Sequence, residues 1–135
     1  MKKTVVLGAS DNPSRYAYLA ANKLKRFGHP VVPVGIRKGQ VAGEEIITEK
    51  KPIADVDTVT LYVGTNNLPG WYDYILSLKP KRIIFNPGTE NSELESKARA
   101  ENIETIYGCT LVMLSAGEYQ FPFFIYVNGT STLPK

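Results

Sequence analysis

The chain has 135 residues, of which 43% are hydrophobic, and this is enough for the core of one domain. The formal net charge of +3 arises from 16 basic and 13 acidic residues, a balance too mild to indicate nucleic acid or a membrane surface as the main partner. The single cysteine, Cys109, excludes an internal disulfide and a thiolate metal cluster, and no apolar run approaches the roughly 18 residues of a membrane helix. The chain starts with a short strand pattern rather than a signal peptide, so we expect a cytoplasmic protein with no bound metal.

The first part of the chain predicts a strand, a tight loop and a helix. Residues 4–7 are a short apolar run typical of a buried strand, and Gly8 ends it. Residues 14–27 have helical spacing, with Asn12 as the expected cap and Pro13 in the first turn. The N–H groups and partial positive charge of a helix N-terminus make the intervening loop a natural site for an anion.

The rest of the chain alternates short strands and helices. Residues 31–34 predict a second strand near an edge, because Pro33 lacks an N–H, and residues 41–47 indicate either a short edge strand or an extended segment. Further strands are predicted at 58–63, 82–85 and 103–107. Helices are predicted at 68–78, from a cap at Asn91 or Ser92 to residue 101, and at 110–116.

This alternation predicts an α/β fold, a Rossmann-like doubly wound parallel sheet of five strands in the order 3-2-1-4-5. The ligand crevice of such a sheet is then expected between its first and fourth strands. Residues 1–119 would form the domain, and residues 120–135 an apolar C-terminal extension. We expect the extension to pack on the domain, as an added edge strand or a cover, or on a partner, which would be a second copy or an enzyme.

The residues that follow the predicted strands are small, polar or cationic. Since ligands of open α/β sheets bind beyond the carboxyl ends of the strands, these residues are the candidate site. They are Gly8, Ala9, Ser10, Asn12, Pro13 and Arg15 after the first strand, Gly35, Arg37 and Lys38 after the second, Val63, Gly64 and Thr65 after the third, and Asn86, Pro87 and Gly88 after the fourth.

The motif around Gly8 is not that of a standard dinucleotide site. Ser10 and Pro13 occupy positions where the G-x-G-x-x-G fingerprint has glycine, and the chain has no Walker loop. An NAD site carries an acidic residue after the second strand, whereas this chain has Arg37 and Lys38 there. Two cations favour a ribose that carries a phosphate, as NADP and coenzyme A do.

The runs Val6-Leu7-Gly8-Ala9-Ser10 and Asn12-Pro13-Ser14-Arg15-Tyr16, with Val32-Pro33-Val34 further on, resemble the small stand-alone CoA-binding proteins. Their domain is similar to the N-terminal CoA-binding domain of the succinyl-CoA synthetase alpha subunit, and the resemblance covers roughly residues 3–116. It implies a Rossmann-like domain that binds CoA or an acyl-CoA without a catalytic partner domain.

The resemblance also implies roles for individual residues. Gly8, Ala9, Ser10 and Pro13 would line the phosphate loop, and Arg15 stands where the family usually has lysine. Residues 63–65 would border the adenine or the pantetheine, and residues 86–88 match a turn of the family. The family pattern P-V-N-P reads Pro33-Val34-Gly35-Ile36 in this chain.

No catalytic constellation is evident from the residues. The lone His29 follows a helix and precedes a strand, so it lies at the end of the sheet opposite the expected site. We therefore expect binding of CoA or an acyl-CoA without catalysis. An NADP-dependent reductase and a non-catalytic regulatory or docking subunit remain as alternatives.

Overall fold

The computed structural model describes residues 1–120. A parallel sheet of five strands crosses it in the spatial order β2-β1-β5-β6-β7. The strands are β1 (Thr4–Leu7), β2 (Val31–Val34), β5 (Thr58–Leu61), β6 (Arg82–Phe85) and β7 (Glu104–Tyr107). The helices are α1 (Tyr16–Arg26), η1 (Leu68–Trp71), α2 (Tyr72–Ser77), α3 (Ser92–Ala100) and α4 (Thr110–Ser115), and a small hairpin pairs β3 (Gln40–Val41) with β4 (Glu44–Glu45).

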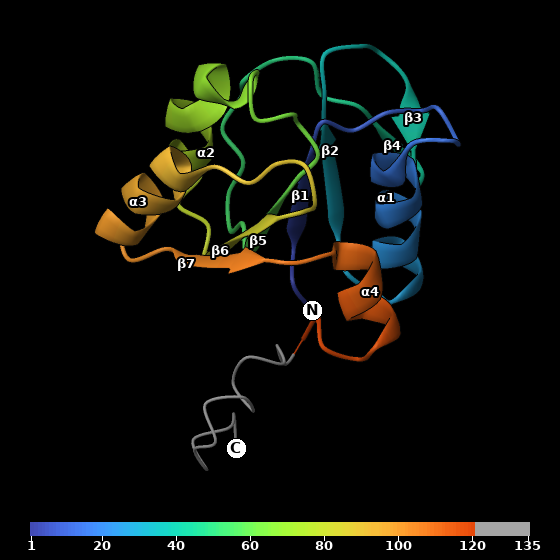
Figure 1. Ribbon diagram of the computed structural model, residues 1–135. Coiled ribbons are helices and arrows are strands. Elements are labelled where there is room, and N and C mark those ends of the chain that lie inside the picture. Colours follow the sequence, from blue (N-terminus) through green and yellow to red (C-terminus); the bar gives the residue numbers. More distant parts are fainter. Residues whose placement is uncertain (121–135) are drawn as a thin grey trace.

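Helices cover both faces of the sheet (Figure 1). Val5 and Leu7 of β1 belong to the core under α2 and α3, whereas Val6 belongs to the core under α1 and α4. Adjacent residues of one strand thus face opposite layers, which explains why β1 is apolar or β-branched at every position and fully buried. The predicted Rossmann-like α/β fold is confirmed.

The predicted strand order is wrong in one respect. The strand after residues 31–34 was expected beside them, but β5 pairs with β1 and β6, in the middle of the sheet. All four residues of β5 are buried, as a central strand requires. In the part of the chain between β2 and β5, Ile47 is the residue that pairs with β2, through an isolated parallel bridge to Val34. With that bridge counted as a strand, the classical 3-2-1-4-5-6 order is restored.

The prediction that residues 31–34 lie near an edge is confirmed, since β2 is one of the two outer strands of the five-stranded sheet. The carbonyl of Pro33 points away from β1 and accepts a hydrogen bond from Ile47 N at 2.9 Å. The missing N–H of proline would point the same way, so no hydrogen bond to β1 is lost.

The ambiguous segment 41–47 includes the hairpin, whose turn residues Ala42 and Gly43 both have positive φ, 54° and 77°. Within residues 1–120, no helix is both long and apolar enough to cross a membrane. The predicted apolar extension, with its added edge strand, lies outside the described residues except for Gln120.

Candidate functional site

The connections of the sheet change direction at β1. The chain leaves β1 for β2 on one side and later crosses back to β5 on the other side of β1. Loops that follow β1 and β5 therefore diverge at the carboxyl end, and ligands of open α/β sheets bind in the crevice this creates. The crevice lies between β1 and β5 rather than beside residues 82–85, as the predicted order implied.

Two glycines bring three loops into close contact at this crevice. Gly8 has a φ of +94°, and a Cβ there would lie 2.8 Å from the carbonyl carbon of Tyr62. A Cβ on Gly35 would lie 2.5 Å from the carbonyl oxygen of Ala9. The amides of Gly8 and Ala9 both donate to the carbonyl of Val34, at 2.8 and 3.0 Å. The first residues beyond β1, β2 and β5 thus lie backbone against backbone, before the loops separate.

The loop between β1 and α1 is organised by its own polar side chains. The Ser10 hydroxyl accepts a hydrogen bond from Asn12 N at 3.0 Å, and the Asn12 carbonyl oxygen Oδ1 accepts from Ser14 N at 3.0 Å. Asn12 was expected to cap the helix, but it closes this turn instead, and Pro13 lies in the turn before the helix.

Arg15 is the residue at the cap of α1, and its side chain forms no capping hydrogen bond with any described residue. The first turn of α1 contains no acidic residue. Its amide groups and partial positive charge therefore face no negative side chain of their own turn, and this helix end is suited to an anion.

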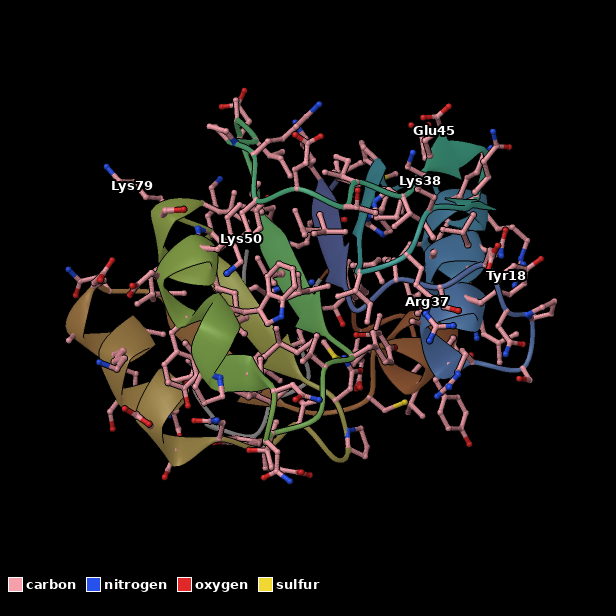
Figure 2. All side chains as sticks on the ribbon, turned by 90° about the horizontal axis from the view of Figure 1, so that it is seen from above. Tyr18, Arg37, Lys38, Glu45, Lys50 and Lys79 are labelled. Carbon is pink, nitrogen blue, oxygen red and sulfur yellow. The ribbon has the colours of Figure 1, made fainter. Side chains whose placement is uncertain are left out.

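The two cations after β2 have different surroundings. Lys38 lines an open cavity of about 470 Å³ together with Glu45, Glu49 and Lys51. Figure 2 shows Lys38 beside Glu45, on the hairpin side of the loop, and Arg37 further toward α1. Both side chains are exposed, so either can meet a ligand, but from different sides of the loop.

The loops after β5 and β6 are connected by a hydrogen bond. The Thr65 hydroxyl donates to the carbonyl of Glu90 at 3.0 Å, and the Glu90 carboxylate accepts from Gly88 N at 2.9 Å. Val63 is half-buried and packs next to Gly8, whereas Gly64, Thr65, Pro87 and Gly88 are exposed. Of the predicted site residues, Gly8, Ala9, Gly35 and Val63 lie against one another directly beyond the strand ends, whereas Thr65 and Gly88 belong to the neighbouring pair of loops. Arg15, Arg37 and Lys38 are exposed around them.

Asn86 is buried beneath these loops, and both the nitrogen and the oxygen of its side-chain amide form hydrogen bonds. Its Nδ2 donates to the Thr60 hydroxyl at 2.7 Å and to the Leu61 carbonyl at 2.9 Å, and its Oδ1 accepts from Thr110 N at 2.9 Å. The hydroxyls of Thr60 and Thr110 lie 2.7 Å apart. This network holds β5, β6 and the start of α4 together, and it leaves both amide protons of Asn86 engaged.

Tyr62 is a residue of this end of the sheet that the sequence did not single out. It is half-buried, and its hydroxyl has no hydrogen-bond partner among residues 1–120. Burial raises the pKa of this hydroxyl well above its ordinary value, and the nearby Cys109 adds to the rise. The only sequence signal was its place at the end of a strand, where it was counted as part of the strand. No cluster of three metal-ligating side chains occurs in the described part of the chain.

These features define a Rossmann-like α/β protein with a short, tight loop at the carboxyl end of β1. The model of the CoA binding domain family matches residues 2–115, and the chain belongs to that family. No curated protein matches the chain.

Solved structures support the fold over the same region. An uncharacterized protein of known crystal structure is 60% identical, with a TM-score of 0.85, over 87% of this chain and 97% of its own. The structure called cell-free ID.343, from Thermus thermophilus, is 24% identical, with a TM-score of 0.74, over 86% of this chain and 89% of its own. A dinucleotide-forming acetyl-coenzyme A synthetase 1 from Ca. Korarchaeum cryptofilum is 19% identical, with a TM-score of 0.63, over 78% of this chain and 25% of its own.

Proposed function

We propose that this protein binds coenzyme A or an acyl-CoA at the carboxyl ends of β1, β2 and β5, as a cytoplasmic binding module without chemistry of its own. The observation that carries the proposal is the amino end of α1, which has no side-chain cap and no acidic residue in its first turn, in a chain of the CoA binding domain family. An anion such as the pyrophosphate of CoA satisfies such a helix end.

The loop that begins at Gly8 and Ser10 connects β1 with this helix end, so a ligand at the helix end would also contact the loop. The positive φ of Gly8 turns the backbone sharply after β1, and a side chain on Gly8 or Gly35 would collide with the backbone of the neighbouring loop. The pyrophosphate would lie over this loop, near the exposed side chain of Arg15. Val63 and the exposed residues Gly64 and Thr65 would border the adenine or the pantetheine.

The ribose phosphate of CoA would be stabilised by a nearby cation. Of the two candidates, Arg37 and Lys38, we favour Arg37. Lys38 shares its cavity with the carboxylates of Glu45 and Glu49, which compete with a phosphate for it. Arg37 does not line that cavity, and its planar guanidinium can bind a phosphate through two N–H groups at once.

A second candidate ligand is NADP, since the same pair of cations after β2 also fits a 2′-phosphate. A reductase would in addition need a proton donor beside the nicotinamide. Burial raises the pKa of the Tyr62 hydroxyl well above its ordinary value, which does not favour proton release near neutral pH.

A thermal-shift titration of the full chain with CoA, dephospho-CoA, NADP and NAD tests the proposal. A ligand that binds only the folded state raises the unfolding temperature in proportion to the logarithm of its concentration over Kd. We expect the largest rise with CoA, a smaller rise with dephospho-CoA and the smallest with NAD. A larger rise with NADP than with CoA would favour the second candidate, and no response to any of the four would favour a docking role.

A further inference from the structure

The two edges of the five-stranded sheet differ in how far they are covered. At the β2 edge, Ile47 donates to the Pro33 carbonyl at 2.9 Å and accepts from Gly35 N at 3.0 Å, and proline itself has no N–H to offer. At the other edge, no residue in the described range 1–120 pairs with the outer side of β7. An uncovered strand edge is a template for another strand, so β7 is the edge of this domain to which a strand can be added.

The backbone groups on the outer side of β7 belong to Thr105 and Tyr107. The N–H groups of Glu104 and Gly108 donate to carbonyls at or next to the two ends of β6, at 3.0 and 3.1 Å. Successive residues of a strand direct their N–H and C=O groups to opposite sides, so those of Thr105 and Tyr107 point away from β6. In an antiparallel pair, two residues that face each other in this way exchange two hydrogen bonds.

The side chains of α3 beside this edge carry opposite charges in a fixed order. Glu95 and Arg99 form an ion pair of 2.9 Å, and the Arg99 side chain is still 65% exposed. Arg99 Nε donates to the Thr105 hydroxyl at 3.0 Å, whereas the Tyr107 hydroxyl donates to the Glu95 carboxylate at 2.8 Å. The helix therefore runs antiparallel to β7 (Figure 1), with its cation beside Thr105 and its anion beside Tyr107.

This arrangement is its own complement. A two-fold axis at Ile106 would place Thr105 of each copy opposite Tyr107 of the other, so that every outward N–H and C=O group of these two residues is paired. The same axis brings Arg99 of each copy to Glu95 of the other, because each charge lies beside one of the two paired residues. A strand edge that satisfies both its backbone groups and its charges in this way is suited to a second copy of the same chain.

The remaining positions of the edge also tolerate this pairing. Ile106 is half-buried against the core under α1 and α4, and it would face Ile106 of the other copy as an apolar cross-strand pair. Glu104 would face Gly108, so no like charges oppose each other. On the other face, the exposed residues Ser92 and Ser96 lie on the same side of α3 as its charged pair, and their small side chains allow two α3 helices to approach.

We propose that two copies of this chain dimerise through β7, as an antiparallel pair that joins their sheets into one continuous sheet. The charge order along α3 selects a second copy as the occupant of this edge, because antiparallel pairing matches each cation with an anion. The proposal is independent of the proposed CoA site, since β5 and β6 lie between the crevice and β7. The two sheets run in opposite directions in such a dimer, so the two crevices open at opposite ends and both stay accessible.

Sedimentation equilibrium of the full chain between about 1 and 100 µM tests the proposal, and we expect a concentration-dependent equilibrium of monomer and dimer. Thr105→Pro removes an outward N–H but no hydrogen bond to β6, and it should raise the Kd of the dimer at least roughly tenfold. Thr105→Val is the matched control, because it removes the same hydroxyl and keeps the N–H. Leu19→Lys adds a charge to an exposed apolar residue of α1. Both controls should keep the Kd within about threefold.

Charge exchange on α3 tests the same interface without a proline. Glu95→Arg and Arg99→Glu each bring like charges together across the two-fold axis, so either variant alone should dimerise at least roughly tenfold more weakly. An equimolar mixture of the two variants faces positive with negative positions again, and its heterodimer should come within about threefold of the unsubstituted Kd. A chain that is monomeric at about 100 µM would overturn the proposal. A dimer that withstands Thr105→Pro or is lost with Leu19→Lys would also overturn it, as would a mixture no tighter than either variant alone.

Discussion

Replacement of Asn86 by alanine tests whether this residue stabilises the domain from beneath the site. The substitution removes three hydrogen bonds of 2.7–2.9 Å and leaves the Leu61 carbonyl and the Thr110 amide without their partner. Each bond contributes about 1 kcal/mol net, and a buried group left without a partner costs a similar amount or more. We therefore expect Asn86→Ala to lower the free energy of unfolding by about 3 kcal/mol.

The assay is guanidinium unfolding of the full chain without ligand, read as the change in midpoint at constant slope. Thr65→Ala is the matched control, because its side chain is exposed: the hydroxyl donates to the Glu90 carbonyl at 3.0 Å and accepts only a long hydrogen bond from Asn91 Nδ2, at 3.4 Å. We expect the control to lose less than about 1 kcal/mol. A loss of the same small size for Asn86→Ala would refute the structural role assigned to its amide.

Three further predictions concern other parts of the molecule. Gly8→Ala should cost roughly 2 kcal/mol in chemical unfolding because of its positive φ and its contact with backbone, whereas Gly64→Ala, with open space at its Cβ, should be nearly neutral. Arg37→Glu should weaken CoA about tenfold more than dephospho-CoA in titration calorimetry, and Lys38→Glu should affect the two ligands equally; equal losses with Arg37→Glu would contradict its contact with the ribose phosphate. Burial, with nearby positive charges, lowers the pKa of His29 below 6.5. The unfolded state then binds the proton more readily, so stability should fall as the pH drops below about 6.5, and a His29→Gln variant with an unchanged pH profile would contradict this.

The local structure was largely predictable because it depends on short-range patterns. The apolar run before Gly8 and the helical spacing after Ser14 predicted β1 and α1 within two residues of their bounds. Asn91 was one of two predicted caps, and its side chain does accept from Leu94 N, at 2.8 Å. Asn12 was predicted by the same rule, yet its side chain bonds to Ser14. Both asparagines precede a helix, so the sequence alone does not reveal which of them uses its side chain in a separate turn.

Long-range pairing was the part that sequence reasoning could not determine. The partner of β5 depends on which segment fills the edge beside β2, and a single residue, Ile47, fills it. At the site, Asn86 was selected for its place after a strand, but burial decides that its amide serves the network with Thr60 and Thr110. Residue type and position at a strand end selected the candidate loops, while the place of the crevice required the strand order and the structural role of Asn86 required the packing.

Titration calorimetry of the full chain with CoA is the most direct test of the central claim. We predict saturable binding of one CoA per chain, with weaker binding of dephospho-CoA under the same conditions. Absence of binding of both CoA and an acyl-CoA at ligand concentrations up to about 1 mM, where even a weak site is half occupied, would contradict the proposed function.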